Sequence, residues 1–163
     1  MRHVIKLFLA IALSIFPSAF SATSLPQSPP NIGVSGKLSA NNVKRGRSVQ
    51  GTVVMEIPGG YHVNSNHPLE KFLVATQLQV EAPQGVRVGP IIYPRAVLRT
   101  FKFSKSRVSV YEGRAIMRFT VSVPANAKTG SAELKAHLRY QSCNDEVCFP
   151  PRTQEVSLWL TIN

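Results

Sequence analysis

Cys143 and Cys148 are the only cysteines of the 163-residue chain, and four residues separate them in the segment YQSCNDEVCFPP, residues 140–151. Thiols at this spacing allow three kinds of chemistry. They brace a turn as a disulfide, supply half of a metal site, or exchange electrons with the thiols of another protein. The remaining sequence bears on the choice between these readings.

A disulfide between the two cysteines requires a tight turn. Five residue steps of extended chain would hold the two Cα atoms roughly 17 Å apart, whereas a disulfide needs about 4.4–6.8 Å. The intervening residues are Asn144, Asp145, Glu146 and Val147. Asn and Asp favour turns, so we expect the cysteines to flank the tip of a hairpin.

The short spacing makes this bond a weak brace. A closed loop of six residues stabilises a fold by only about 2 kcal/mol in the chain-entropy model, against about 4 kcal/mol for a loop of about 50 residues. A small surface-lying ring is also one that a partner thiolate can reach. Hairpin disulfides nevertheless occur as ordinary structure, so the spacing leaves both the brace and the working pair open.

A metal site is a third reading, because a closed zinc site needs four ligands. His137 falls on the polar face of a predicted strand, where solvent is its expected neighbour. Only His62 and His67 could join the cysteines, which would make an unusual two-plus-two site. A catalytic Cys–His dyad built from the same residues has no support from their spacing. No metal and no other cofactor is therefore expected.

The N-terminal residues predict export. Residues 1–22 combine a positive start at Arg2 and Lys6 with an apolar run from Leu7 to Phe16, which is typical of a signal peptide cleaved near Ser21 or Ala22. The run is too short to span a bilayer. Residues 23–31 are rich in Pro and Ser and predict a flexible leader, and residues 32–163 predict one domain. In the periplasm, where we expect this protein, a disulfide persists.

The charge of the chain is strongly basic, at +11, and removal of Arg2 and Lys6 leaves +9. The basic residues are scattered singly, and the densest group, Lys44 to Arg47, falls in a predicted turn. No nucleic-acid-binding motif is present. We therefore expect a solvated basic surface, no nucleic-acid partner and no membrane span after signal cleavage.

Apolar and polar residues alternate along most of the chain after residue 31, which predicts strands with one wet face. The clearest strands are 48–57, 114–123, 131–140 and 153–162, with weaker ones at 61–65, 72–82, 86–93 and 107–111. Gly- and Pro-containing turn signals separate them. The pattern predicts an all-β fold, an antiparallel immunoglobulin-like β-sandwich of seven to nine strands.

The cysteine segment after a strand, GGYHVNSNHP well upstream of it, and FKFSKSRVSVYEG between them resemble the N-terminal domain of the bacterial thiol:disulfide interchange reductase DsbD. The resemblance covers residues 32–163, and the cysteine segment is its most specific part. It implies an immunoglobulin-like sandwich whose cysteine pair, here Cys143 and Cys148, shuttles electrons to or from thioredoxin-fold proteins. It also implies that Cys148 forms the mixed disulfide and that Cys143 resolves it.

The resemblance further implies a cap loop that covers the pair with an aromatic side chain. The matching stretch is RTFKFSKS, so Phe103 is the first candidate for the lid and Phe101 the second, although plain packing would also account for both. The strand that lies beside the disulfide in the family matches Tyr61, His62 and Asn64.

Two features differ from the full family pattern. Asp145 and Glu146 place negative charge between the sulfurs, which disfavours a thiolate, although a solvated hairpin tip explains them equally. The sequence also has no counterpart of the membrane or thioredoxin-like domains. We therefore expect a component of a protein-disulfide reductase that is served by a separate membrane or thioredoxin-like reductant.

The alternative function is a non-catalytic periplasmic β-sandwich that binds or assembles proteins and carries a structural hairpin disulfide. Under the redox reading, the sequence leaves the downstream pathway open between disulfide repair, cytochrome c biogenesis and peroxide defence.

Overall fold

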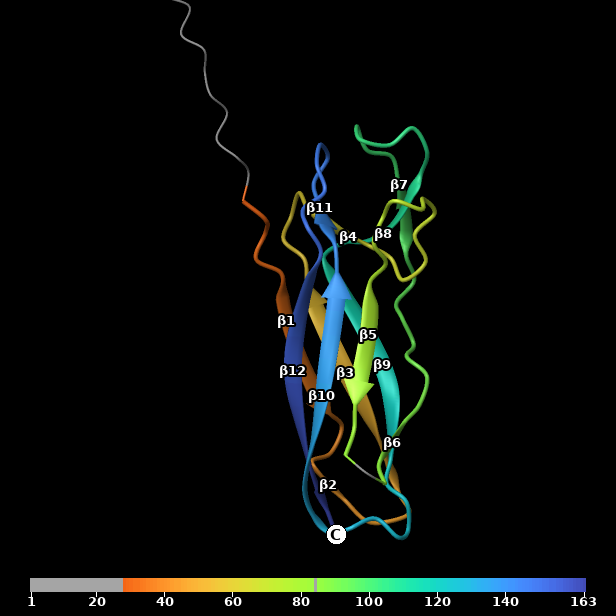
Figure 1. The fold of residues 1–163 in the computed structure, drawn as a ribbon, viewed down its shortest axis with the longest axis vertical. Coiled ribbons are helices and arrows are strands. Elements are labelled where there is room, and N and C mark those ends of the chain that lie inside the picture. The colour runs from red at the N-terminus through yellow and green to blue at the C-terminus, as the bar shows by residue number, and fades with distance from the viewer. Residues whose placement is uncertain (1–27, 84) are drawn as a thin grey trace, which may run out of the picture.

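The computed structural model describes residues 28–83 and 85–163. All the regular secondary structure in these ranges is β-strand (Figure 1). The predicted signal peptide and residues 23–27 of the predicted leader lie outside the described residues. Within the described ranges, no helix is long and apolar enough to cross a membrane. The predicted all-β fold class is confirmed.

Two four-stranded sheets form the body of the domain, and their strands run along its long axis (Figure 1). The first sheet contains, in spatial order, β1 (Gly33–Leu38), β3 (Ser48–Glu56), β9 (Arg114–Ser122) and β6 (Arg87–Val88). The second contains β2 (Asn42–Val43), β12 (Arg152–Ile162), β10 (Gly130–Tyr140) and β5 (Gln77–Glu81). Paired strands are antiparallel except for β2 and β12, which are parallel.

A third, smaller sheet lies at one end of the long axis (Figure 1). Its strands, in spatial order, are β11 (Ser142–Cys143), β4 (His62–Asn64), β8 (Val108–Tyr111) and β7 (Val97–Arg99). The loop between β7 and β8 and the loop between β11 and β12 reach beyond this sheet at the same end (Figure 1). The third sheet therefore brings the cysteine segment together with residues 97–111.

The apolar residues of the alternating strands fill the core between the two long sheets. Met117 and Phe119 from β9 and Leu134 and Leu138 from β10 are all at most 1% exposed, and burial of each such side chain contributes about 1.5–3 kcal/mol. Gly51 lies opposite Phe119 in the β3–β9 register. A Cβ at that position would come within 2.2 Å of the Phe119 ring, so only glycine leaves room for this side chain.

The predicted long strands coincide with β3, β9, β10 and β12 to within a residue or two at each end. Twelve strands lie within the described residues, against the seven to nine expected, largely because β2, β6 and β11 have two residues each. Alternation cannot reveal elements this short. The predicted strand at 72–82 shortens to β5, and the chain before it forms a loop over the cysteine segment.

Candidate redox site

The cysteines flank a tight turn that extends the β10–β12 hairpin. The two strands pair from Gly130 and Ile162 to Tyr140 and Arg152, and the connecting residues project past them (Figure 1). Cys143 and Cys148 are joined by a disulfide with a Cα–Cα distance of 4.0 Å, and their backbones form an antiparallel bridge. The predicted hairpin position of the pair is thus what the structure shows.

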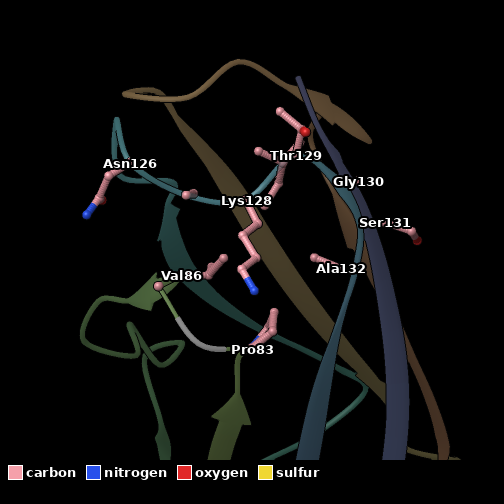
Figure 2. Close-up of a pocket in the computed structure, with 11 residues that line it drawn as sticks. Pro83, Val86, Asn126, Lys128, Thr129, Gly130, Ser131 and Ala132 are labelled. Carbon is pink, nitrogen blue, oxygen red and sulfur yellow. The ribbon is translucent and has the colours of Figure 1, made fainter.

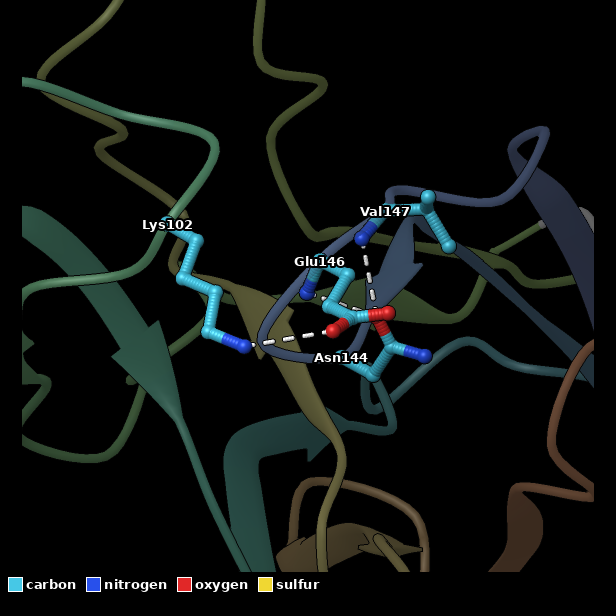
Figure 3. Close-up of polar contacts among 4 residues, drawn as sticks. All are labelled: Lys102, Asn144, Glu146 and Val147. Atoms are coloured by element: carbon cyan, nitrogen blue, oxygen red, sulfur yellow. Dashed lines mark hydrogen bonds and ion pairs between the residues drawn. The ribbon is translucent and has the colours of Figure 1, made fainter.

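The turn between the sulfurs is organised by Asn144. Its backbone N–H donates to the Val147 carbonyl at 2.9 Å. Its side-chain Oδ1 accepts from the backbone N–H groups of Glu146, at 2.9 Å, and Val147, at 2.8 Å (Figure 3). An Asn side chain that bonds the backbone two residues on is the turn chemistry expected from this sequence.

The two sulfurs differ in their access to solvent. Cys143 is 0% exposed and lies in β11, which pairs with β4 inside the third sheet. Cys148 is partly exposed. The expectation of a surface-lying ring therefore holds for Cys148 and is wrong for Cys143. A thiolate that approaches from solvent meets Cys148 first.

Phe101 and Phe103 form an aromatic layer over the site. The two rings are stacked with centroids 5.3 Å apart, and Phe101 also stacks on His62 at 3.9 Å. Both phenylalanines pack with Cys148 against a small apolar cluster of Leu73, Val108 and Val110. Phe101 and Phe103, the two candidates for the lid, are therefore both part of the apolar packing around Cys148.

The loop that carries these rings is fastened to the cysteine turn by Lys102. Its backbone N–H donates to the Asp145 carbonyl at 3.2 Å, and its Nζ lies 3.2 Å from Glu146 Oε1 (Figure 3). Both side chains of this ion pair are more than half exposed, so it contributes at most about 1 kcal/mol. The loop is therefore joined to the cysteine turn by one backbone hydrogen bond and one exposed ion pair.

His62 lies beside Cys143 in the third sheet, since the two residues are direct partners in the β4–β11 register. Its side chain is buried, and its Nε2 has no hydrogen-bond partner among the described residues. Burial lowers the pKa of His62 from 6.5 to about 4, although the nearby charges of Glu112 and Asp145 act in the opposite direction. The imidazole is therefore neutral at physiological pH.

The other two residues of the predicted neighbouring strand also contact the cysteine segment. The Tyr61 ring packs against Phe149, with centroids 6.3 Å apart. Asn64 Nδ2 donates to the Val74 carbonyl at 3.2 Å and to Gln141 Oε1 at 3.0 Å. The predicted strand beside the disulfide is thus in place.

Gln141, Leu73 and Lys102 belong to the site but were not predicted. Gln141 Oε1 also accepts from the Val74 N–H at 3.0 Å, and its Nε2 donates to the Phe149 carbonyl at 3.2 Å. This amide ties the loop at residue 74 to the cysteine segment. The position of Gln141, two residues before Cys143, is the sequence signal that could have placed it at the site. Leu73 lies in residues 72–82, for which the pattern predicts a strand.

An open pocket of about 340 Å³ lies next to the exposed sulfur. Its lining residues are Phe72, Leu73, Phe103, Gln141, Glu146, Val147 and Cys148. Phe72 and Val147 are exposed, at 65% and 43%. Exposed apolar side chains therefore lie next to the disulfide.

Another cavity, of about 620 Å³, lies at the opposite end of the sandwich, between the side of Pro83, Gly85 and Val86 and the segment 126–132. The Lys128 side chain extends across it (Figure 2). None of the predicted site residues lines it, so it has no part in cysteine chemistry.

Of the histidines considered as metal ligands, only His62 lies beside the cysteines. His67 is exposed in the loop after β4, and His137 lies on β10 between Glu81 and Glu155, at 3.5 and 3.4 Å. Within residues 28–83 and 85–163, no group of three or more His, Cys, Asp or Glu side chains could hold a metal ion.

The sequence matches a known protein family. Residues 36–159 match the family described as "Thiol:disulfide interchange protein DsbD, N-terminal", which is most of the chain. The comparison with curated proteins returned no match.

Among solved structures, the N-terminal periplasmic domain of ScsB from Proteus mirabilis aligns with a TM-score of 0.50 and 14% identity, over 80% of this chain and 45% of that chain. The match thus spans less than half of the ScsB structure and bears on the fold alone. The reduced DsbD N-terminal domain of Neisseria meningitidis aligns with a TM-score of 0.45 and 20% identity, over 68% of this chain and 77% of that chain.

Proposed function

Because this chain belongs to the family of the DsbD N-terminal domain, we propose that it is a thiol:disulfide interchange module that passes electrons through Cys143 and Cys148. The observation that carries the proposal is the asymmetry of the pair. The disulfide closes a short ring, with one sulfur buried and the other partly exposed beside an open pocket whose lining residues are mostly apolar. A purely structural bond requires neither the pocket nor the exposed sulfur.

The exchange proceeds in two displacements. A thiolate of a partner dithiol attacks Cys148, the bond to Cys143 breaks, and the Cys143 sulfur leaves with the electron pair. The second thiol of the partner then attacks the mixed disulfide and releases Cys148. The partner ends as a disulfide and this pair as two thiols, and the relative reduction potentials set the direction.

The partners in this proposal are thioredoxin-fold proteins of the periplasm, reached after export and removal of residues 1–22. A separate membrane or thioredoxin-like reductant supplies or removes the electrons. Phe103, with Phe101 beneath it, shields the pair between encounters. The acidic turn residues Asp145 and Glu146 disfavour a free thiolate, which suits a pair that reacts only with a docked partner.

Covalent trapping tests the proposal directly. In a Cys143→Ser variant, the Cys148 thiol attacks a partner disulfide and forms a mixed disulfide that this chain can no longer resolve, so that only the reverse step by the partner's second thiol releases Cys148. We expect a thioredoxin-fold protein to remain attached under non-reducing conditions and to be released by a reductant. The matched control is Cys148→Ser, in which the buried Cys143 should capture far less. If neither variant traps a thioredoxin-fold protein, the exchange function is wrong.

The reduction potential separates this function from that of a binding module with a structural bond. Equilibration of the protein against glutathione buffers measures it. A potential above about −300 mV agrees with a bond that biological thiols can open. A potential below that value would assign the disulfide a structural role.

A further inference from the structure

Cys148, Cys143 and His62 form one row across the third sheet. Cys143 pairs with Cys148 on one side and with His62 on the other. Side chains that are directly opposite each other on neighbouring strands share a face, with Cβ atoms about 5 Å apart. The imidazole is therefore the immediate neighbour of the buried sulfur, on the side away from the disulfide bond.

The His62 imidazole is buried, but one of its nitrogens lacks a hydrogen-bond partner among the described residues. His62 is 2% exposed, and the Phe101 ring stacks on it at 3.9 Å. Its Nε2 is buried and unpaired among the residues that the structure describes. An unpaired buried polar atom destabilises the state that contains it, so a hydrogen-bond partner for this nitrogen would stabilise the protein.

Two other polar side chains near the row, those of Glu112 and Asn64, are engaged elsewhere or lie further along the strand. Glu112, which lines the same 320 Å³ cavity as His62, binds Arg99 at 3.0 and 2.8 Å. Asn64 Oδ1 is also buried and unpaired among the described residues. However, Asn64 is two residues further along β4 than His62, next to Gln141. His62 is thus the group best placed for the Cys143 sulfur.

Reduction changes what the Cys143 sulfur can offer. In the disulfide it carries no proton and no charge. After the first displacement it leaves as a thiolate, which accepts a hydrogen bond, and after protonation it is a thiol, which donates one. The environment of Cys143 is dry, and an unpartnered thiolate is unfavourable there. A neutral imidazole can form a hydrogen bond with either the thiolate or the thiol, because one ring nitrogen is a donor and the other is an acceptor.

We propose that His62 Nε2 forms a hydrogen bond with the Cys143 sulfur in the reduced form, and so favours the dithiol over the disulfide. Either tautomer serves, since N–H pairs with the thiolate and bare N with the thiol. The inference rests on the proposed exchange function, and it makes His62 the residue that sets the redox balance of the pair.

The test compares His62→Phe with the wild-type protein. Phenylalanine keeps a flat ring for stacking on Phe101 and removes both nitrogens. The full mature chain is equilibrated with reduced and oxidised dithiothreitol, and the fraction of dithiol is measured by thiol alkylation. We expect the equilibrium constant for reduction to fall about tenfold, which is about 30 mV for a two-electron couple. His137→Phe, the same change on β10, is the matched control and should leave the constant unchanged.

A measurement on the wild-type protein supports or contradicts the inference even if His62→Phe does not fold. The imidazole ¹⁵N chemical shifts of His62 should change on reduction in the manner of a newly formed hydrogen bond, while those of His137 stay constant. An unaltered equilibrium constant in a folded His62→Phe protein, or unaltered His62 shifts, would overturn the inference. Since both readouts use only a small dithiol, they are independent of whether a thioredoxin-fold partner is ever trapped.

Discussion

At the level of single residues, the two cysteines are near-equivalent in sequence and unequal in the folded protein. Both lie in one twelve-residue segment, yet Cys143 is fully buried and Cys148 is partly exposed. Strand pairing with β4 creates this difference. In the proposed exchange, Cys148 receives the attack and Cys143 is the leaving sulfur, which agrees with the order that the family resemblance implies.

The buried imidazole of His62 predicts a pH dependence of stability. Its pKa is about 4 in the folded protein and 6.5 as an unperturbed side chain, so between these values the unfolded state binds more protons. The stabilisation is complete above pH 6.5 and is lost as the pH falls toward 4. The loss amounts to up to about 3 kcal/mol. Urea unfolding of the wild type and of His62→Phe between pH 7 and pH 4 measures it.

The carboxylates are common to both proteins, so the difference between their pH slopes isolates the histidine. The wild type should lose more stability toward acid than His62→Phe. Parallel curves for the two proteins would show that His62 is as accessible to protons in the folded state as in the unfolded one.

At the level of elements, the loop between β7 and β8 is the segment that we propose as the lid of the site. It packs through Phe101 and Phe103 and is fastened through Lys102. These are few contacts, and the ion pair among them is exposed. Segments with few buried contacts open at low free-energy cost, which is what a lid over a reactive bond requires.

Phe103→Ala tests the lid. The truncation removes one ring from the layer over the disulfide and leaves the two long sheets untouched. We expect the fold to be retained and the rate of reduction by a small thiol to rise severalfold, because the rate depends on access to the sulfur. Stopped-flow or quenched reaction with dithiothreitol gives the rate, and circular dichroism checks the fold.

Phe72→Ala is the matched control, since Phe72 lines the same pocket but is exposed and is not part of the buried cluster. Its rate with dithiothreitol should stay near that of the wild type. An unchanged rate in Phe103→Ala would mean that this ring packs without shielding the bond.

At the level of the whole molecule, the sandwich does not depend on its disulfide. The bond closes a ring of six residues, which contributes about 2 kcal/mol, while the core is formed by two complete four-stranded sheets. The Cys143→Ser/Cys148→Ser double variant should therefore remain folded and lose about 2 kcal/mol of unfolding free energy. Urea titration of the double variant and the wild type checks this, and loss of cooperative unfolding would assign the bond a larger structural part.

The long strands were predictable because the alternation that marks each strand lies within its own residues. In β10 and β12, apolar side chains recur at every second residue, and a strand with one buried face needs only that pattern. The short strands β2, β6 and β11 were not predictable, because two residues show no period. The predicted turn at residues 144–147 followed from Asn chemistry, which is also local.

The sequence by itself determined the all-β sandwich, the meeting of Cys143 and Cys148 at a turn, and the family, because alternation, turn residues and a specific cysteine segment are local features. Only the tertiary structure decided that Cys143 is buried and Cys148 is partly exposed, and that Gln141 and Lys102 join two loops to the cysteine segment. It also decided that His62 lies beside the buried sulfur with an Nε2 that has no hydrogen-bond partner among the described residues. These facts depend on contacts between segments far apart in the chain, and such contacts exist only once the third sheet has formed.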